Sequence, residues 1–340
     1  MELGKEIDSM AKSNGHKLRN LVLVLVLLVV LFLIPNIITN TYYLHLIILT
    51  LLWIILTSGL NIIQGYAGHV SLCQIGFYGI GAYTSGLLMV KFQLPMVVGL
   101  IAAVLMGLII GTIIGIPTLR TKGHYFSIAT LSFTLLLFSL MNNWFDLTGG
   151  YNGFSIKKLQ GNIFGFALSD RQGYYYLVLI FVIVTIAFVT FLMRSRTGRA
   201  IVTIRENENL AKAIGVNTVG IKLLAFDISA ILACIAGVLY AHYMNYVNPT
   251  SFTGTIGMNA ILAVMIGGCG TVVGPILGSA VVIFLPEILR MAELYRQLIF
   301  GVLLIIVVFL LPNGLVPPIS KLIHKITDKL KVNKSAAKTE

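Results

Sequence analysis

Long apolar runs, separated by short polar breaks, constrain the fold of this chain more than any other feature. Hydrophobic residues make up 57% of its 340 positions and charged residues 11%, whereas soluble domains carry about a quarter charged residues. A helix that crosses a bilayer requires about 20 apolar residues. The sequence therefore predicts an all-α fold, a polytopic transmembrane helical bundle.

The apolar runs and the residues that break them predict eight crossings and one irregular stretch. The expected crossings lie near 21–39, 43–64, 70–90, 96–116, 125–145, 174–193, 220–244 and 297–311. The irregular stretch, Met258 to Arg290, is long for one crossing and short for two, and glycines interrupt its middle. It predicts either a re-entrant pair or two short spans. The bundle is thus expected to have eight to ten spans with discontinuous or re-entrant segments.

The basic residues predict which side of the membrane each connection faces. Most of the 24 Lys and Arg residues fall in segments that share a side with the N-terminus, while Lys157, Lys158 and Arg171 are among the few on the other side. By the positive-inside rule both termini are cytoplasmic, in a plasma or inner membrane. We expect a cytoplasmic segment over 1–20, a membrane domain over 21–315 and a basic cytoplasmic tail over 316–340.

The tail carries apolar residues at helical spacing, with lysines on the other face. This pattern predicts a helix lying on the anionic inner leaflet, with a disordered basic tail as the alternative. The net charge of +12 does not gather in one stripe, so no nucleic-acid partner is expected.

No motif of an enzyme or a metal site is present. The patterns HExxH, GxSxG, GxGxxG and GxxxxGK[ST] do not occur. Cys73, Cys234 and Cys269 lie far apart in apolar stretches and are expected to be small buried hydrophobes. The chain is therefore predicted to be a transport subunit rather than an enzyme, to bind no metal or cofactor, and to rely on separate subunits for any ATP hydrolysis.

Polar residues and glycines alternate at two places inside the apolar part, which predicts a solute path. Polar groups in lipid must face a cavity or other helices, and glycines let a helix unwind near the midplane. The candidate path residues are Asn61, Gln64, Gly65, Tyr66, Gly68, His69, Ser71 and Gln74, with Gly267, Gly268 and Gly270 in the second half. The alternative for each glycine is close helix packing through small residues.

Asp227 is the one acidic residue deep in an expected span. It could bind a proton or cation. The interpretation we favour is a hydrogen bond between helices.

The segment from Arg194 to residue 218 has mixed charge and apolar residues at rough helical spacing: Ile201, Ile204, Leu210, Ala213 and Ile214. Gly215 is a natural helix stop. The pattern predicts one short amphipathic helix offered to the cytosol. Its length exceeds that of an ordinary connection, which favours a docked partner.

In and after this segment the chain carries the blocks Gly198–Ala200, Ile204–Glu208, Ala211, Ala213–Asn217 and Lys222–Phe226. In these blocks it resembles the LivM-type permeases of branched-chain amino-acid ABC importers. Further similar blocks are Gly59–Leu72, Gly79–Tyr83, Tyr125–Leu131, Thr148–Gly153, Gly237–Tyr243, Gly267–Pro275 and Pro312–Leu315.

The resemblance implies a permease subunit that works with a second, LivH-like permease, two ABC ATPase subunits and an extracytoplasmic solute-binding protein. The substrate would be leucine, isoleucine or valine. The segment 194–218 would then be gripped by the ATPases, through Gly198, Arg199, Ala200, Ile204, Arg205, Glu206, Ala211 and Gly215.

Two other readings stay open at this point. A urea or short-chain amide ABC importer would share this architecture. A self-contained, ion-coupled secondary transporter would need no ATPase, and Asp227 is its best support. A membrane-embedded enzyme is a weaker third possibility, because no cluster of His and acidic residues is expected around one cavity.

Overall fold

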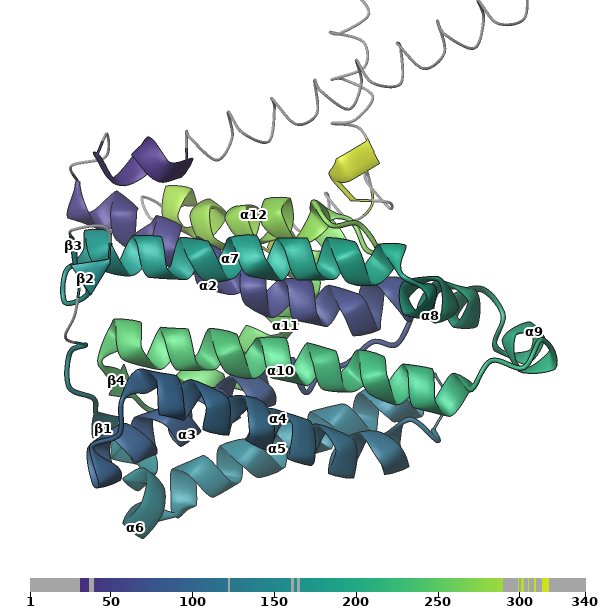
Figure 1. Ribbon diagram of the computed structural model, residues 1–340, viewed down its shortest axis with the longest axis horizontal. Coiled ribbons are helices and arrows are strands. Elements are labelled where there is room, and N and C mark those ends of the chain that lie inside the picture. The colour runs from purple at the N-terminus through teal and green to yellow at the C-terminus, as the bar shows by residue number, and fades with distance from the viewer. Residues whose placement is uncertain are drawn as a thin grey trace, which may run out of the picture.

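The computed structural model of this chain describes residues 31–36, 40–121, 123–159, 162–163, 166–289, 299, 301–302, 305, 309 and 314–317. In this part the chain forms a bundle of long helices (Figure 1). The helices are α2 (Thr41–Asn61), α3 (Gln74–Phe92), α4 (Met96–Thr118), α5 (His124–Asn143), α6 (Phe145–Thr148), α7 (Arg171–Arg194), α8 (Arg196–Glu206), α9 (Glu208–Ala213), α10 (Thr218–Met244), α11 (Gly254–Gly267) and α12 (Gly274–Ile288). Short helical turns are η1 (Ile62–Tyr66), η2 (Gly150–Asn152) and η3 (Pro249–Phe252).

Helix α10 lies at the centre of the bundle and packs against α2, α3 and α4. Nearly all of its residues are apolar or small and most of them are buried, as expected for a helix surrounded by others. Small residues allow its close approach to α3. A Cβ at Gly81 would overlap the main chain of Cys234, and one at Gly237 would overlap that of Tyr78.

Helix α4 shows why an almost uniformly apolar sequence still packs in one orientation. Its buried residues include a row at every fourth position: Gly99, Ala103, Gly107, Gly111 and Gly115. This row faces α10 and α3, because added Cβ atoms would contact Cys234, Asp227 and Ser85. The opposite face carries large exposed apolar side chains such as Ile101 and Ile113. That face suits contact with lipid.

Six of the described helices are long and apolar enough to cross a bilayer. The chain is therefore an all-α, multi-pass membrane protein, as the sequence predicted. The irregular stretch forms two helices, α11 and α12, that pack against each other around a turn at residues 268–273. The turn confirms the predicted break, and whether the pair re-enters or spans stays a prediction.

Helix α3 begins later than the expected crossing at 70–90, because residues 67–73 form an irregular connection after η1. The predicted crossings at 21–39 and 297–311 fall largely outside the described residues, although 31–36 are helical. The terminal segment 1–20 and the tail helix beyond 318 lie outside them entirely.

The bundle has two distinct ends (Figure 1). At one end, which we call the strand end, β1 (Phe154–Ser155) pairs antiparallel with β4 (Tyr246–Val247), and β2 (Asn162–Ile163) pairs with β3 (Phe166–Ala167). At the other, the α8–α9 end, α8 and α9 project beyond the long helices. Helices α7 and α10 run between the two ends.

Candidate functional site

The segment between α7 and α10 consists of two short helices. Ser195 caps α8 by accepting a hydrogen bond from Gly198 N (3.2 Å). Asn207 ends α8 in an extended conformation and caps α9 by accepting from Leu210 N (3.0 Å). The prediction of one amphipathic helix was wrong, because Asn207 is extended and its side chain starts a new helix.

The two helices divide the apolar residues of the segment into an inner and an outer set. Ile201 and Ile204 of α8 and Ala211 of α9 are buried. Gly198 is also buried, and a Cβ there would overlap the main chain of Leu192 at the end of α7. These contacts fix α8 against the long helices.

The outer set is open to solvent. Leu210, Ile214 and Val219 are 58%, 65% and 55% exposed, and we call these three residues the outer apolar patch. Arg199 and Glu206 are exposed too, and the Arg199 side chain donates locally, from Nη1 to Arg194 O (3.0 Å). Of the other predicted residues here, Ala200 is half-buried, whereas Gly215 is exposed and ends α9. This face is available to a partner.

Arg205 points the other way and connects α8 to the broken helix of the first half. Its Nη1 donates to Gly65 O of η1 at 2.7 Å. Its side chain also lies against two other glycines, since Cβ atoms at Gly68 and Gly270 would come within 3.0 and 3.1 Å of it. A charged donor on a main-chain carbonyl is among the stronger hydrogen bonds in proteins.

Asn61 completes this junction. Its Nδ2 donates to Thr271 O (2.8 Å), and its Oδ1 accepts from Gly270 N (2.9 Å). A Cβ at Gly65 would overlap both Asn61 Oδ1 and Gly270 N, so only glycine allows this approach. We call Asn61, Gly65, Arg205, Gly270 and Thr271 the Arg205 junction. It brings together residues of both glycine-broken stretches and of the α8–α9 segment.

Other predicted path residues lie apart from this junction. Gln74 Nε2 donates to Leu56 O and to Ser229 O, both at 3.1 Å, and Gln74 Oε1 accepts from Ser229 Oγ (2.9 Å). Gln74 thereby joins α2, α3 and α10. Ser71 is buried and bonded to Cys73 Sγ (3.0 Å).

The remaining candidates surround the connection after η1. Gln64 and Tyr66 are buried in η1, and Gln64 Oε1 has no hydrogen-bond partner among the described residues. His69 is half-buried with its ring 5.4 Å from that of Phe126, and Gly68 is exposed. Gly267 and Gly268 are buried beside Gly274. That all these residues line one solute path stays a prediction.

A partly buried ion pair, which the sequence interpretation did not identify, holds α9 to α10. Lys222 is 6% exposed, and its Nζ contacts Glu208 Oε2 at 2.7 Å. Lys212 contacts Glu208 Oε1 at 3.0 Å. The hydrogen bond from Lys222, helped by Lys212 and opposed by burial, lowers the pKa of Glu208 to about 2. The i,i+4 spacing of Glu208 and Lys212 could have predicted their ion pair from the sequence. The contact with Lys222 could not be predicted in this way, because Lys222 lies on the next helix, after a turn of the chain.

Asp227 makes the hydrogen bond between helices that we favoured. Thr112 Oγ1 of α4 donates to Asp227 Oδ2 at 3.1 Å. Of the cysteines, Cys73 and Cys234 are buried as expected, but Cys269 is exposed. It was wrongly predicted to be buried, because the turn between α11 and α12 lifts it out of the packed helices.

Comparison with known proteins defines the family. The model of the branched-chain amino acid transport system / permease component family matches residues 42–308. The chain belongs to this family. The match covers nearly all of the described bundle, including the Arg205 junction.

This permease is similar to several curated proteins. It is 34% identical over 314 residues to the high-affinity branched-chain amino acid transport system permease protein LivM of Escherichia coli K12, covering 86% of this chain and 72% of that protein. It is 24% identical to LivH of the same organism over 281 residues (77% and 90%). It is 28% identical to the ribose import permease protein RbsC over 269 residues (76% and 79%). No solved structure matches this permease.

Proposed function

We propose that this chain is the membrane-spanning permease subunit of an ATP-driven importer for branched-chain amino acids: leucine, isoleucine and valine. The similarity to LivM, over most of both chains, supports this substrate class. Membership of the permease family supports transport over catalysis.

The proposed assembly contains this chain, a LivH-like second permease, two ABC ATPase subunits and an extracytoplasmic solute-binding protein. The chain has no P-loop motif, so ATP hydrolysis falls to the partner subunits. The distribution of Lys and Arg supports a cytoplasmic α8–α9 end and cytoplasmic termini. The strand end then faces the side from which solute arrives.

The single observation that carries this proposal is that α8 and α9 expose one face to solvent and contact the glycine-broken stretches of the bundle through the other. The outer apolar patch, with Arg199 and Glu206 beside it, offers a surface to an ATPase. Arg205 connects the same element to both glycine-broken stretches of the bundle. Movement of a docked ATPase would therefore be passed through a hydrogen-bonded junction to η1 and to the turn at 268–273.

Reconstitution tests this function. The purified chain alone in proteoliposomes is expected to give no leucine uptake with or without ATP. Uptake should appear when the second permease, both ATPases, the binding protein and ATP are all present. Uptake by the chain alone, driven by an ion gradient, would contradict the proposal.

The same preparation decides the substrate class. Unlabelled isoleucine and valine should compete with leucine, while urea, acetamide and ribose should not. Ribose belongs in this panel because a ribose import permease is among the similar proteins. Uptake of urea, acetamide or ribose in place of leucine would keep the ATP-driven mechanism and overturn the substrate.

A further inference from the structure

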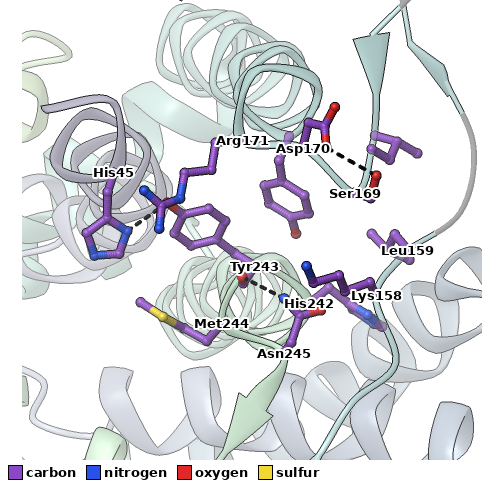
Figure 2. Close-up of a pocket in the computed structure, with 12 residues that line it drawn as sticks. His45, Lys158, Leu159, Ser169, Asp170, Arg171, His242, Tyr243, Met244 and Asn245 are labelled. Carbon is purple, nitrogen blue, oxygen red and sulfur yellow. Dashed lines mark hydrogen bonds between the residues drawn. The ribbon is translucent and has the colours of Figure 1, made fainter. Parts of the chain in front are cut away.

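A cavity of about 310 Å³ opens at the strand end, between the beginning of α2, the beginning of α7 and the end of α10 (Figure 2). Two stretches of the connection between α6 and α7, residues 158–159 and 168–170, complete its wall. Pockets for small ligands begin at about 300 Å³. The cavity is thus large enough for one small molecule and too small for a peptide segment of several residues.

Charges of both signs line this cavity. Lys158 and Arg171 supply positive charge and Asp170 supplies negative charge. Arg171 is held in place, because its Nη1 donates to Thr41 O at 3.0 Å. Asp170 accepts a long hydrogen bond of 3.4 Å from Ser169 Oγ (Figure 2). In the described part of the chain no ion pair joins Asp170 to Lys158 or Arg171, so their charges are available to a ligand.

Two buried polar atoms in the cavity wall also lack partners. His242 is 2% exposed; its Nε2 is bonded to Ser85 Oγ at 2.7 Å, and its Nδ1 has no partner among the described residues. Asn245 donates from Nδ2 to Tyr243 O (3.2 Å), but its Oδ1 has no partner there. Buried polar groups are normally hydrogen-bonded, so these two residues make this part of the cavity wall polar.

The rest of the wall is apolar or aromatic. Leu159, Leu168, Tyr174 and Met244 contribute it. The Tyr243 hydroxyl is fixed by a 2.7 Å hydrogen bond with His45 Nδ1. One cavity therefore combines two cations, an anion, further polar side chains and an apolar surface.

We propose that this cavity binds one free, zwitterionic α-amino acid with an apolar side chain. Lys158 and Arg171 would hold its carboxylate, Asp170 its ammonium group, and the leucines and Met244 its side chain. The proposal rests on the proposed function and adds to it a site on the side from which solute arrives. A simple anion would face the charge of Asp170, and a simple cation the charges of Lys158 and Arg171, so a zwitterion fits best.

Binding of radiolabelled leucine to the complete transporter tests the site. The transporter is held in nanodiscs without ATP and without the binding protein. Lys158→Gln, Arg171→Gln and Asp170→Asn should each weaken leucine binding about tenfold, as expected for loss of one charged contact. Lys157→Gln is the matched control, because Lys157 is exposed beside Lys158 but does not line the cavity. It should bind leucine as the unchanged protein does.

Competing ligands separate the two charged ends. Leucinol, which lacks the carboxylate, and 4-methylpentanoate, which lacks the ammonium group, should each compete about tenfold less well than leucine. Lys158→Gln should reduce the difference in binding affinity between leucine and leucinol, because the variant lacks a partner for the carboxylate. Absence of saturable leucine binding, or equal losses in Lys157→Gln and Lys158→Gln, would overturn the site.

ATP-driven uptake by the same samples distinguishes this site from the proposed function. Normal leucine uptake in the three cavity variants, with unchanged leucine binding, would overturn the site and leave the function intact. Leucine binding that depends on the three charged residues, with no ATP-dependent leucine uptake, would support the site and count against the function.

Discussion

The charged side chains make different contacts at the two ends of the bundle. At the α8–α9 end Arg205 is bonded to the carbonyl of Gly65, and Glu208 is bonded to both Lys212 and Lys222. At the strand end Lys158, Asp170 and Arg171 surround a cavity without an ion pair between them, and Arg171 donates to the carbonyl of Thr41. The ion pairs of Glu208 hold α9 to α10, whereas the charges around the cavity have no opposite charge bound to them in the described part of the chain and are free to meet a ligand.

This difference indicates separate roles for the two ends, which α7 and α10 connect. Hydrogen bonds to charged groups contribute about 1.5–3 kcal/mol each. If the α8–α9 end couples to an ATPase as we propose, such bonds would let it pass on the movement of that ATPase. The charges of the strand end would then serve to bind the solute.

Replacing Arg205 should have the largest effect. Arg205→Ala removes the bond to Gly65 but leaves the outer apolar patch intact, so the ATPases should still co-purify while ATP-driven uptake falls about tenfold or more. Uptake in proteoliposomes and the ATPase content of the purified complex are the two measurements.

Three further variants sharpen this result. Arg196→Ala, an exposed position at the start of α8, is the matched control and should leave uptake unchanged. Arg205→Lys keeps the charge but loses the guanidinium geometry and should restore only part of the uptake. The Arg205→Ala, Glu206→Ala double variant should lose uptake, insert normally into the membrane and retain less ATPase. Normal uptake in Arg205→Ala would show that the junction transmits nothing.

The Glu208–Lys222 pair should have the next largest effect. Glu208→Gln leaves Lys222 buried without its carboxylate and should lower the free energy of unfolding by about 1–2 kcal/mol, reduced because Glu208 is partly exposed. Glu208→Gln combined with Lys222→Met should regain much of this loss. Thermal unfolding in nanodiscs gives the measurement, and Lys212→Gln, which removes only the exposed partner, should change little.

The same pair predicts a pH dependence. The pKa of Glu208 is lowered to about 2 by Lys222, so its carboxylate stabilises the folded chain fully at neutral pH. This stabilisation is lost as the pH falls from about 4.5, the ordinary value, towards 2. The Glu208→Gln variant should lack this part of the acid sensitivity. An identical acid profile in both proteins would contradict the assignment.

The long helices could be predicted from sequence because each is a continuous apolar run that only the membrane accommodates. The break at Asn207 could not, since Ile201, Ile204, Leu210 and Ile214 keep a period compatible with one helix. Only packing against α7 and α10 decides that the first two are buried and the last two exposed.

The Arg205 junction could be predicted only in part, because its contacts also join residues far apart in the sequence. The glycines at 65 and 270 indicated that something approaches the main chain closely, but nothing local indicated that Arg205, 140 positions from Gly65, is the group that does so. The strand-end cavity was not predicted at all. Its residues come from separate segments, and Lys158 and Arg171 are informative in sequence only as outer charges.

Cys269 offers a smaller and more local effect. It is the exposed cysteine of the three, and it lies in the turn that Asn61 holds. A maleimide reagent should therefore label Cys269 from the cytoplasmic side, and Asn61→Ala should raise the labelling rate about two- to tenfold by freeing the turn. Cys269→Ser is the control and should abolish labelling. Labelling from the opposite side only would overturn the proposed orientation of the α8–α9 end.

The smallest effect is expected between the two ends, at Asp227. Its carboxylate accepts from Thr112 and joins α4 to α10, a role that an amide oxygen can also fill. Asp227→Asn should therefore change ATP-driven leucine uptake by no more than about twofold. An ion-coupled transporter that used this residue would instead lose coupled uptake when the carboxylate is removed, because an amide cannot carry the proton or pair with the cation. Uptake measured with ATP and with an imposed proton gradient distinguishes the two outcomes. Complete loss in Asp227→Asn, with Thr112→Val unaffected, would mean that the charge between the two ends, rather than the junction at one of them, controls transport.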